Sequence, residues 1–192
     1  IICPVQIFDR LDKSNQDLVT QALTDPETQL TVGKYLIEGK ESFPRNIEIG
    51  LKYLKESIAC GCLKSVLYYS NMLIKGDIIP QDIESAKRLL FKHLKEDDSM
   101  VHFLYGLVLK KQKYYADSMK YFAKASKEGN INSKYEYAKM LFCQKSGIFG
   151  TNQENIEKAI YYLNDSSSHG NKNSEKFLKV YYKLNEVWNL KN

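Results

Sequence analysis

One spacing recurs along the chain and limits its fold more than any other feature. Four positions are each followed 20 residues later by a matching position; the pairs are Gly50 and Ser70, Ala86 and Gly106, Ser118 and Ala138, and Ala159 and Lys179. A further match to the second members lies upstream at Gly33. Eleven residues after the first members come Gly61, Asp97, Gly129 and Gly170. Such a repeat is typical of helical hairpins that stack as a solenoid.

The residues around the second members indicate the first helix of each hairpin. Apolar or aromatic side chains stand one position before and three positions after them: Val32, Tyr69, Tyr105, Tyr137 and Leu178, then Leu36, Leu73, Leu109, Leu141 and Tyr182. Apolar groups four apart around a small residue form one face of a helix that can approach a neighbour closely. Lys179 breaks the small-residue pattern, which is expected of a terminal capping helix.

The second helix of each hairpin carries a start signal. Asn46, Asp82 and Asn155 each precede Ile-Glu and stand four residues before the small position. Asn or Asp at an N-cap accepts a hydrogen bond from a free backbone N–H, and the Glu suits the positive end of the helix dipole. The third hairpin has Tyr114 in this region and lacks the cap. Glycines at the eleven-residue position predict helix ends in the left-handed conformation.

These signals predict an all-α, right-handed α-α superhelical solenoid of about four helical hairpins plus a C-terminal capping helix. The predicted solenoid covers 26–184, with hairpins at 26–62, 63–98, 99–130 and 131–171, a terminal helix at 172–188 and a tail at 189–192. Residues 1–25 do not fit the spacing. Ser14–Asp17 resembles a capped helix start, with Leu18, Val19, Ala22 and Leu23 as an apolar side before Asp25-Pro26. This segment is either an N-terminal cap or a linker to an upstream domain.

The pattern resembles the Sel1-like repeats, relatives of the tetratricopeptide repeat. The resemblance is clearest in 133–171, which contains Tyr-Ala-Lys-Met-Leu at 137–141, Glu-Lys-Ala at 157–159 and His-Gly-Asn at 169–171. It departs at Asp97-Asp98, where the family has Gly, and in the short turn of the third hairpin. The resemblance implies a superhelical scaffold that assembles signalling or quality-control complexes, and it implies no enzymatic activity.

In stacked hairpins the first helices line the concave side. Positions three before, one after and four after the small residue are expected to point there. The resulting hypothesis for a partner-binding set is Phe103, Leu107, Lys110, Tyr135, Lys139 and Phe142. The apolar members would hold anchor side chains of a peptide, and the lysines would pair with its acidic residues. The alternative is that the apolar members pack between helices and the lysines form a solvated face.

Composition narrows the function classes. The net charge of +5 is spread over interleaved Lys, Glu and Asp, without the basic stripe that nucleic-acid binding requires. No apolar run approaches the roughly 18 to 20 residues of a membrane span, and no secretory signal is visible. The chain begins at Ile1 without Met, so we expect it to be a piece of a longer protein whose targeting segments lie elsewhere. Cysteines 3, 60, 62 and 143 do not recur with the repeat, which favours a reducing, cytoplasmic location.

Signals for chemistry are weak. His93, His102 and His169 fall on different hairpins, and Cys60-Gly61-Cys62 lacks the spacing of a zinc motif. A nucleophile pair of Cys143 with His102 is disfavoured because the histidine is expected to pack inside. The segment 147–150 lacks the spacing of a phosphate loop and is predicted to be a turn. No catalytic, cofactor or metal residue is therefore predicted.

The sequence thus favours a non-catalytic protein-interaction scaffold or adaptor that binds a protein or peptide on its concave face. A regulatory or substrate-positioning domain of a larger enzyme, such as a kinase or ubiquitin-ligase component, is the alternative. An array of RNA-binding helical repeats is a third possibility, suggested by the fourteen tyrosines. Six of them, however, occupy positions expected to be buried: Tyr53, Tyr69, Tyr105, Tyr121, Tyr137 and Tyr162.

Overall fold

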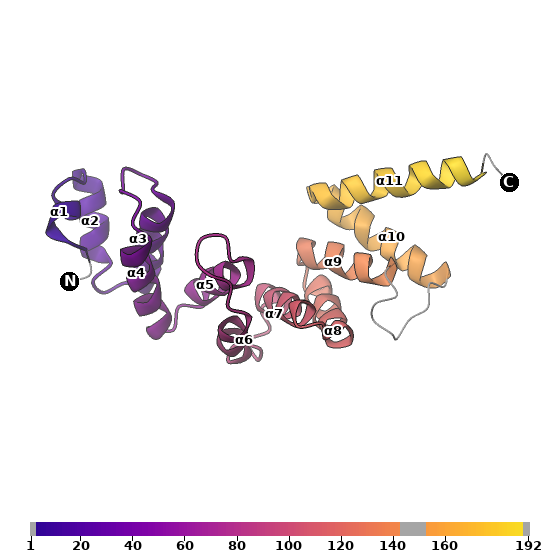
Figure 1. Ribbon diagram of the computed structural model, residues 1–192, viewed down its shortest axis with the longest axis horizontal. Coiled ribbons are helices and arrows are strands. Elements are labelled where there is room, and N and C mark those ends of the chain that lie inside the picture. Colours follow the sequence, from indigo (N-terminus) through magenta and orange to yellow (C-terminus); the bar gives the residue numbers. More distant parts are fainter. Residues whose placement is uncertain (1–2, 143–152, 190–192) are drawn as a thin grey trace. The chain divides into compact units, whose positions relative to one another are not determined.

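The computed structural model describes residues 3–142 and 153–189, which leaves Cys143 and the predicted turn at 147–150 outside the described residues. Within these ranges the chain forms eleven α-helices and no strand (Figure 1). They are α1 Val5–Phe8, α2 Lys13–Gln21, α3 Pro26–Glu38, α4 Ile47–Ala59, α5 Leu63–Lys75, α6 Ile83–Phe91, α7 Ser99–Lys111, α8 Tyr115–Lys127, α9 Ile131–Phe142, α10 Gln153–Ser168 and α11 Lys172–Asn189. No helix in the described ranges is long and apolar enough to cross a membrane. The chain divides into two compact units, 1–80 and 81–192.

The first unit is built on the hairpin of α3 and α4. Gly33 and Gly50 let the two backbones meet: a Cβ on Gly50 would lie 2.7 Å from the Gly33 carbonyl oxygen and 2.6 Å from Ile37 Cγ1. Helix α5 packs against both helices of this hairpin. Leu54 and Met72 are buried in one cluster at this junction. The small residues of the repeat therefore set how closely the paired helices approach.

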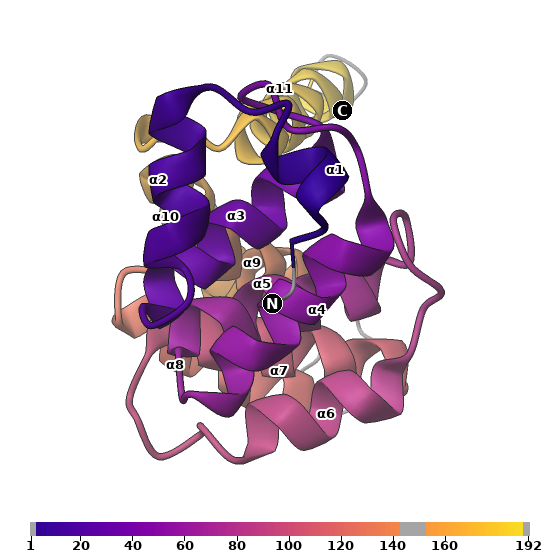
Figure 2. The ribbon, with the colours of Figure 1, turned by 90° about the vertical axis from the view of Figure 1, so that its left-hand side faces the viewer.

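The N-terminal segment packs on the first hairpin. Figure 2, which looks at the N-terminal end, shows α2 beside α3. Val19 and Ala22 are buried in the same cluster as residues of α3 and α4, whereas Leu23 is 58% exposed. The predicted helix start at Ser14–Asp17 is wrong by two residues, because Asp12 is the N-cap and its carboxylate accepts a hydrogen bond from the Asn15 N–H at 2.9 Å.

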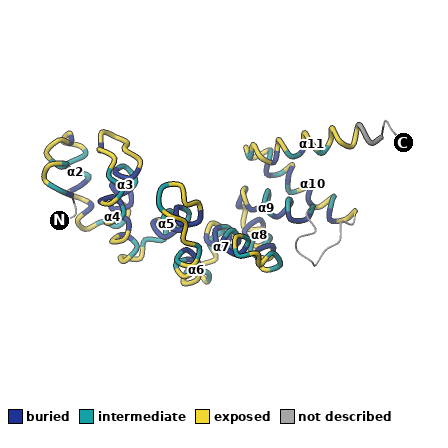
Figure 3. The backbone as a smooth tube through the Cα atoms, in the orientation of Figure 1, coloured by how far each residue is buried: buried dark blue, intermediate teal, exposed yellow. Residues whose placement is uncertain are grey.

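The second unit contains the hairpins α7–α8 and α9–α10, with α8 packed on α9, α6 on α7, and α11 on α10. Ser118 faces Gly106 and donates a hydrogen bond to its carbonyl oxygen at 2.8 Å. Ala138 and Ala159 hold the equivalent places in the next hairpin and are fully buried. Figure 3 shows α7 largely buried, while much of α11 is exposed.

Helix ends follow the predicted signals at most junctions. Asn46 and Asp82 are N-caps of α4 and α6, and each accepts a hydrogen bond from a backbone N–H at 3.0 Å. The predicted cap at Asn155 is wrong: α10 begins at Gln153, whose side chain donates to Glu157 at 3.0 Å and supports the earlier start. The three glycines predicted at helix ends have φ of 83°, 93° and 89°; they are Gly61, Gly129 and Gly170.

The predicted buried tyrosines divide into two groups. Tyr53, Tyr105 and Tyr137 are buried. Tyr69, Tyr121 and Tyr162 are partly buried. Rings held in this way are poorly placed to stack on splayed bases, so the RNA-binding alternative finds no support in them. The hairpin predicted at 63–98 contributes α5 to the first unit and α6 to the second, so its packing as one hairpin stays a prediction.

Candidate partner-binding surface

All six residues of the predicted partner-binding set lie in the second unit, on α7 and α9. We call them the α7–α9 surface: Phe103, Leu107, Lys110, Tyr135, Lys139 and Phe142. On each helix the buried stripe holds the small residue and its apolar neighbours, as with Tyr105, Gly106 and Leu109 on α7. The predicted residues flank this stripe, and each of the six is partly exposed. The buried stripe and the partly exposed flank are therefore distinct on both helices.

The apolar members are supported from behind by the core. Phe103, Leu107, Tyr135 and Phe142 all pack against one cluster of buried residues in the second unit. The ring of Phe103 lies 6.0 Å from that of Phe122, which is fully buried. Aromatic pairs at this separation add to the stability gained from burial. Packing thus fixes one side of each side chain and leaves the other partly exposed.

The lysines differ in their surroundings. Lys110 Nζ forms an ion pair with Glu136 Oε2 at 2.5 Å, and this pair joins α7 to α9. Lys139 Nζ lies 5.7 Å from the centre of the Tyr135 ring. Burial and the nearby Glu136 carboxylate raise the pKa of Tyr135, and Lys110 partly offsets this. Tyr135 is therefore a neutral phenol beside an ammonium group, and Lys139 is the more available of the two lysines.

Phe142 is joined to the next first helix. Its ring lies 5.1 Å from that of Phe177 and 5.6 Å from that of Tyr181, both on α11. Lys110 and Phe142 hold the same repeat position, four after the small residue. Glu136 and Phe177 also share a position, two before the small residue of the following first helix. The two contacts are therefore one repeated contact between successive first helices.

Sequence reasoning missed this repeated contact, although its spacing was readable. In the first unit, Ile37 and Tyr68 hold the same two positions and pack in one cluster. Phe142 therefore packs part of its surface against the next first helix, as the alternative interpretation expected of the apolar members. Lys110 differs from both interpretations, because it pairs with Glu136 of the neighbouring helix.

Comparison with known proteins supports the predicted helical-repeat fold and identifies no partner. No protein-family model matches the chain, and none of the curated proteins matches it. Among solved structures, it is similar to a Sel1 repeat protein from Oxalobacter formigenes, with a TM-score of 0.68 and 16% identity over 81% of this chain and 63% of that one.

It is also similar to c5321, a protective antigen of uropathogenic Escherichia coli strains that displays the same repeat fold. That match has a TM-score of 0.70 and 20% identity, and it covers 84% of this chain and 35% of the antigen. The chain thus spans less than two thirds of either relative. The predicted all-α solenoid of helical hairpins is confirmed: the chain has the Sel1-like repeat fold.

Proposed function

We propose that the chain is a non-catalytic scaffold or adaptor that binds a segment of a partner protein on the α7–α9 surface. One observation carries the proposal. Side chains from two successive first helices, Phe103 and Leu107 on α7 and Tyr135 on α9, are held by the core and still partly exposed. Rigid aromatic and apolar side chains of this kind lose little conformational entropy on binding and are enriched among residues that dominate interface energy.

The charges on this surface indicate the kind of partner segment. Lys110 is neutralised by Glu136, whereas Lys139 stands beside Tyr135 without a carboxylate at ion-pair distance in the described residues. An apolar anchor of the partner would pack against Tyr135 and Leu107, and a neighbouring Asp or Glu would meet Lys139. A peptide with an aromatic or large aliphatic residue and an acidic residue nearby satisfies both requirements.

A peptide library displayed against the purified chain tests this function. We expect the selected peptides to combine an aromatic or aliphatic residue with Asp or Glu. Tyr135→Ala should then weaken binding of a selected peptide by at least about tenfold, because truncation of a central aromatic residue commonly costs more than 1.4 kcal/mol. Tyr161→Ala is the matched control, since Tyr161 lies on α10, a second helix, and is 66% exposed.

The proposed pairing of Lys139 with an acidic residue of the partner is tested separately with Lys139→Glu. This variant should weaken binding of an acidic peptide and restore affinity for a peptide in which Lys replaces the acidic residue. Lys110 is less suitable for the exchange, because a carboxylate there would face Glu136. Selected peptides that bind Tyr135→Ala and Lys139→Glu as tightly as the unmodified chain would contradict the proposed surface. Far-UV circular dichroism should show unchanged helix content in all variants.

A further inference from the structure

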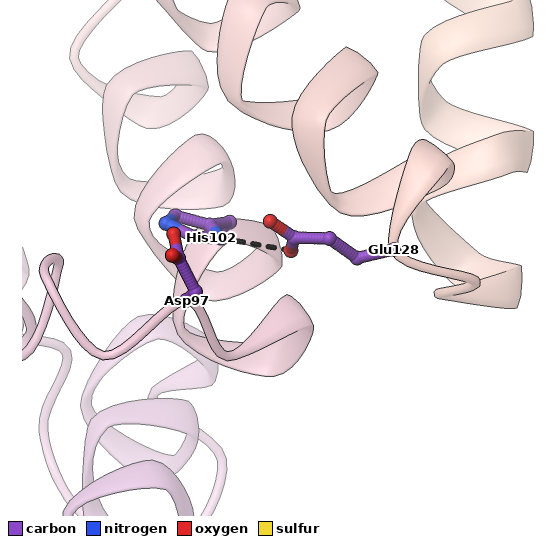
Figure 4. Close-up of side chains that lie close together, drawn as sticks. All are labelled: Asp97, His102 and Glu128. Atoms are coloured by element: carbon purple, nitrogen blue, oxygen red, sulfur yellow. Dashed lines mark hydrogen bonds and ion pairs between the residues drawn. The ribbon is translucent and has the colours of Figure 1, made fainter.

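Three side chains meet where α8 ends and α7 begins, away from the α7–α9 surface. Asp97 precedes α7, His102 lies in its first half, and Glu128 follows α8; Figure 4 shows the three converging. One ligand atom from each residue lies within 4.8 Å of the other two. A ring nitrogen and two carboxylates are the donor set that zinc and similar divalent transition metals accept.

Two oxygen atoms hold the His102 ring. The side chain is 1% exposed, so water does not supply its hydrogen bonds. Its Nε2 lies 3.3 Å from the Leu94 carbonyl oxygen, which accepts a hydrogen bond when Nε2 carries the hydrogen. In that neutral tautomer Nδ1 has a free lone pair, and it lies 2.9 Å from Glu128 Oε2. The ring nitrogen and the carboxylate oxygen are then both available to one metal ion.

The same arrangement is how proteins orient a metal-binding histidine. A histidine that ligates a metal commonly donates its other ring N–H to a backbone carbonyl or a carboxylate, which fixes the tautomer and ring direction. Here the Leu94 carbonyl fills that role for His102. On this geometry we propose that Asp97, His102 and Glu128 form a binding site for a divalent transition-metal cation of the Zn²⁺ type. It is independent of the proposed partner surface.

The ligand separations fit such an ion. A pocket of about 490 Å³ is lined by His102, Tyr105, Tyr121 and Lys124, so one of the three ligands borders it. With metal–ligand distances near 2.0–2.2 Å, tetrahedral ligands stand about 3.3 Å apart, so small side-chain rotations suffice from the present separations. Three protein ligands leave a fourth position for water.

Lys124 is the competitor for this site. Its Nζ pairs with Asp97 Oδ1 at 2.8 Å, and its side chain is 46% exposed and free to swing into solvent. The other charged residues that line the pocket are Asp117 and Lys120, which pair with each other at 2.9 Å. The ring of Tyr121 covers that of His102 at 6.1 Å. Removing the Lys124 ammonium should therefore strengthen metal binding.

The test is calorimetric titration of the full 192-residue chain, freed of any histidine tag, with ZnCl₂. It is made in a Cys60→Ser/Cys62→Ser background, which removes the thiols at 60 and 62 as alternative zinc ligands. We expect one binding event. Asp97→Gly should lose at least about tenfold in affinity, because even outer-shell changes cost 10–100-fold. Lys124→Met should gain affinity.

A melting-temperature measurement and a control variant distinguish loss of a metal ligand from a general loss of stability. Asp97 has φ of 46° where the equivalent residues of other turns are glycines, so Asp97→Gly should raise the melting temperature of the metal-free protein while it removes the zinc-induced rise. His93→Gln is the matched control, because His93 also pairs with a glutamate, Glu96, and should leave the affinity unchanged.

The proposal is overturned if zinc does not bind, if Asp97→Gly binds it as tightly as the parent chain, or if Ca²⁺ at equal concentration displaces it. The last result would show attraction of cations to carboxylates without a histidine ligand.

Discussion

Gly50→Ala tests whether the small residues of the repeat set the distance between paired helices. The added methyl group would lie 2.6 Å from Ile37 Cγ1 and 2.7 Å from the carbonyl oxygen of Gly33. The second contact is with backbone of the facing helix, so it can be relieved only if α3 and α4 move apart. We therefore expect the substitution to destabilise the first hairpin, although alanine is the better helix former.

The expected magnitude is a difference between two opposing effects. Replacing Gly by Ala within a helix contributes about 1 kcal/mol in favour of folding. Overpacking a tight interior costs about 1–3 kcal/mol, and a backbone clash lies at the upper end of that range. The free energy of unfolding should thus fall by about 1–2 kcal/mol, measured by urea unfolding followed by circular dichroism at the helix band.

Gly106→Ala is the matched comparison. There the added methyl group would meet Phe122 ring atoms at 2.8 and 2.9 Å, and no backbone atom is among its three nearest neighbours. A ring can tilt at lower cost than two helices can separate, so this variant should lose less stability than Gly50→Ala. If Gly50→Ala were as stable as the parent chain, or if Gly106→Ala lost more, close backbone contact would not be what limits this position.

Further predictions concern two helix caps and a partly buried ion pair. Asn46→Ala should lower the free energy of unfolding by about 1 kcal/mol in urea, because it removes the side-chain cap of α4, whereas Tyr114→Asn should raise it by supplying the cap that α8 lacks. A hydrogen bond from Lys134, at 2.5 Å, holds the pKa of Asp165 below its ordinary 3.8. The folded state therefore binds this proton less readily than the unfolded chain. The stabilisation is present above about pH 4 and is lost as the pH falls further. The free energy of unfolding, measured in urea, should fall less between roughly pH 6 and pH 2.5 in Asp165→Asn than in the parent chain. An identical fall in both proteins would show that the Lys134–Asp165 pair is not the source of the pH dependence.

The parts of the fold that could be predicted from sequence depend on local residue chemistry. Small residues such as Gly33 and Ala138 are required wherever two backbones meet, and the cap at Asn46 follows from one side chain and the N–H three residues on. Each signal is complete within a single turn or hairpin. The cap expected at Asn155 was wrong because the preceding turn of helix, stabilised by Gln153, can form without it.

Contacts between hairpins were harder to predict, because they depend on which residues two repeats present to each other. The repeat position shared by Lys110 and Phe142 meets Glu136 in one case and Phe177 in the other, so geometry is conserved while chemistry changes from an ion pair to an aromatic pair. A rule based on residue type along one helix cannot find such a contact. A rule based on paired repeat positions can.

The same reasoning explains why the cluster at Asp97, His102 and Glu128 has no sequence motif. Metal motifs are recognisable when two ligands share one helical turn, but here the ligands stand 5 and 26 residues apart and meet through stacking of α7 on α8. One signal was nevertheless present. Asp97 stands where the equivalent turns of the other hairpins have glycine, and its backbone is left-handed, with φ of 46°. The His102 position gives no such signal, because other repeats have Gln29, Lys134 and Glu175 there. In a repeat protein, a departure from the repeat pattern at a position that favours glycine is therefore a place to look for a site that the repeat itself does not require.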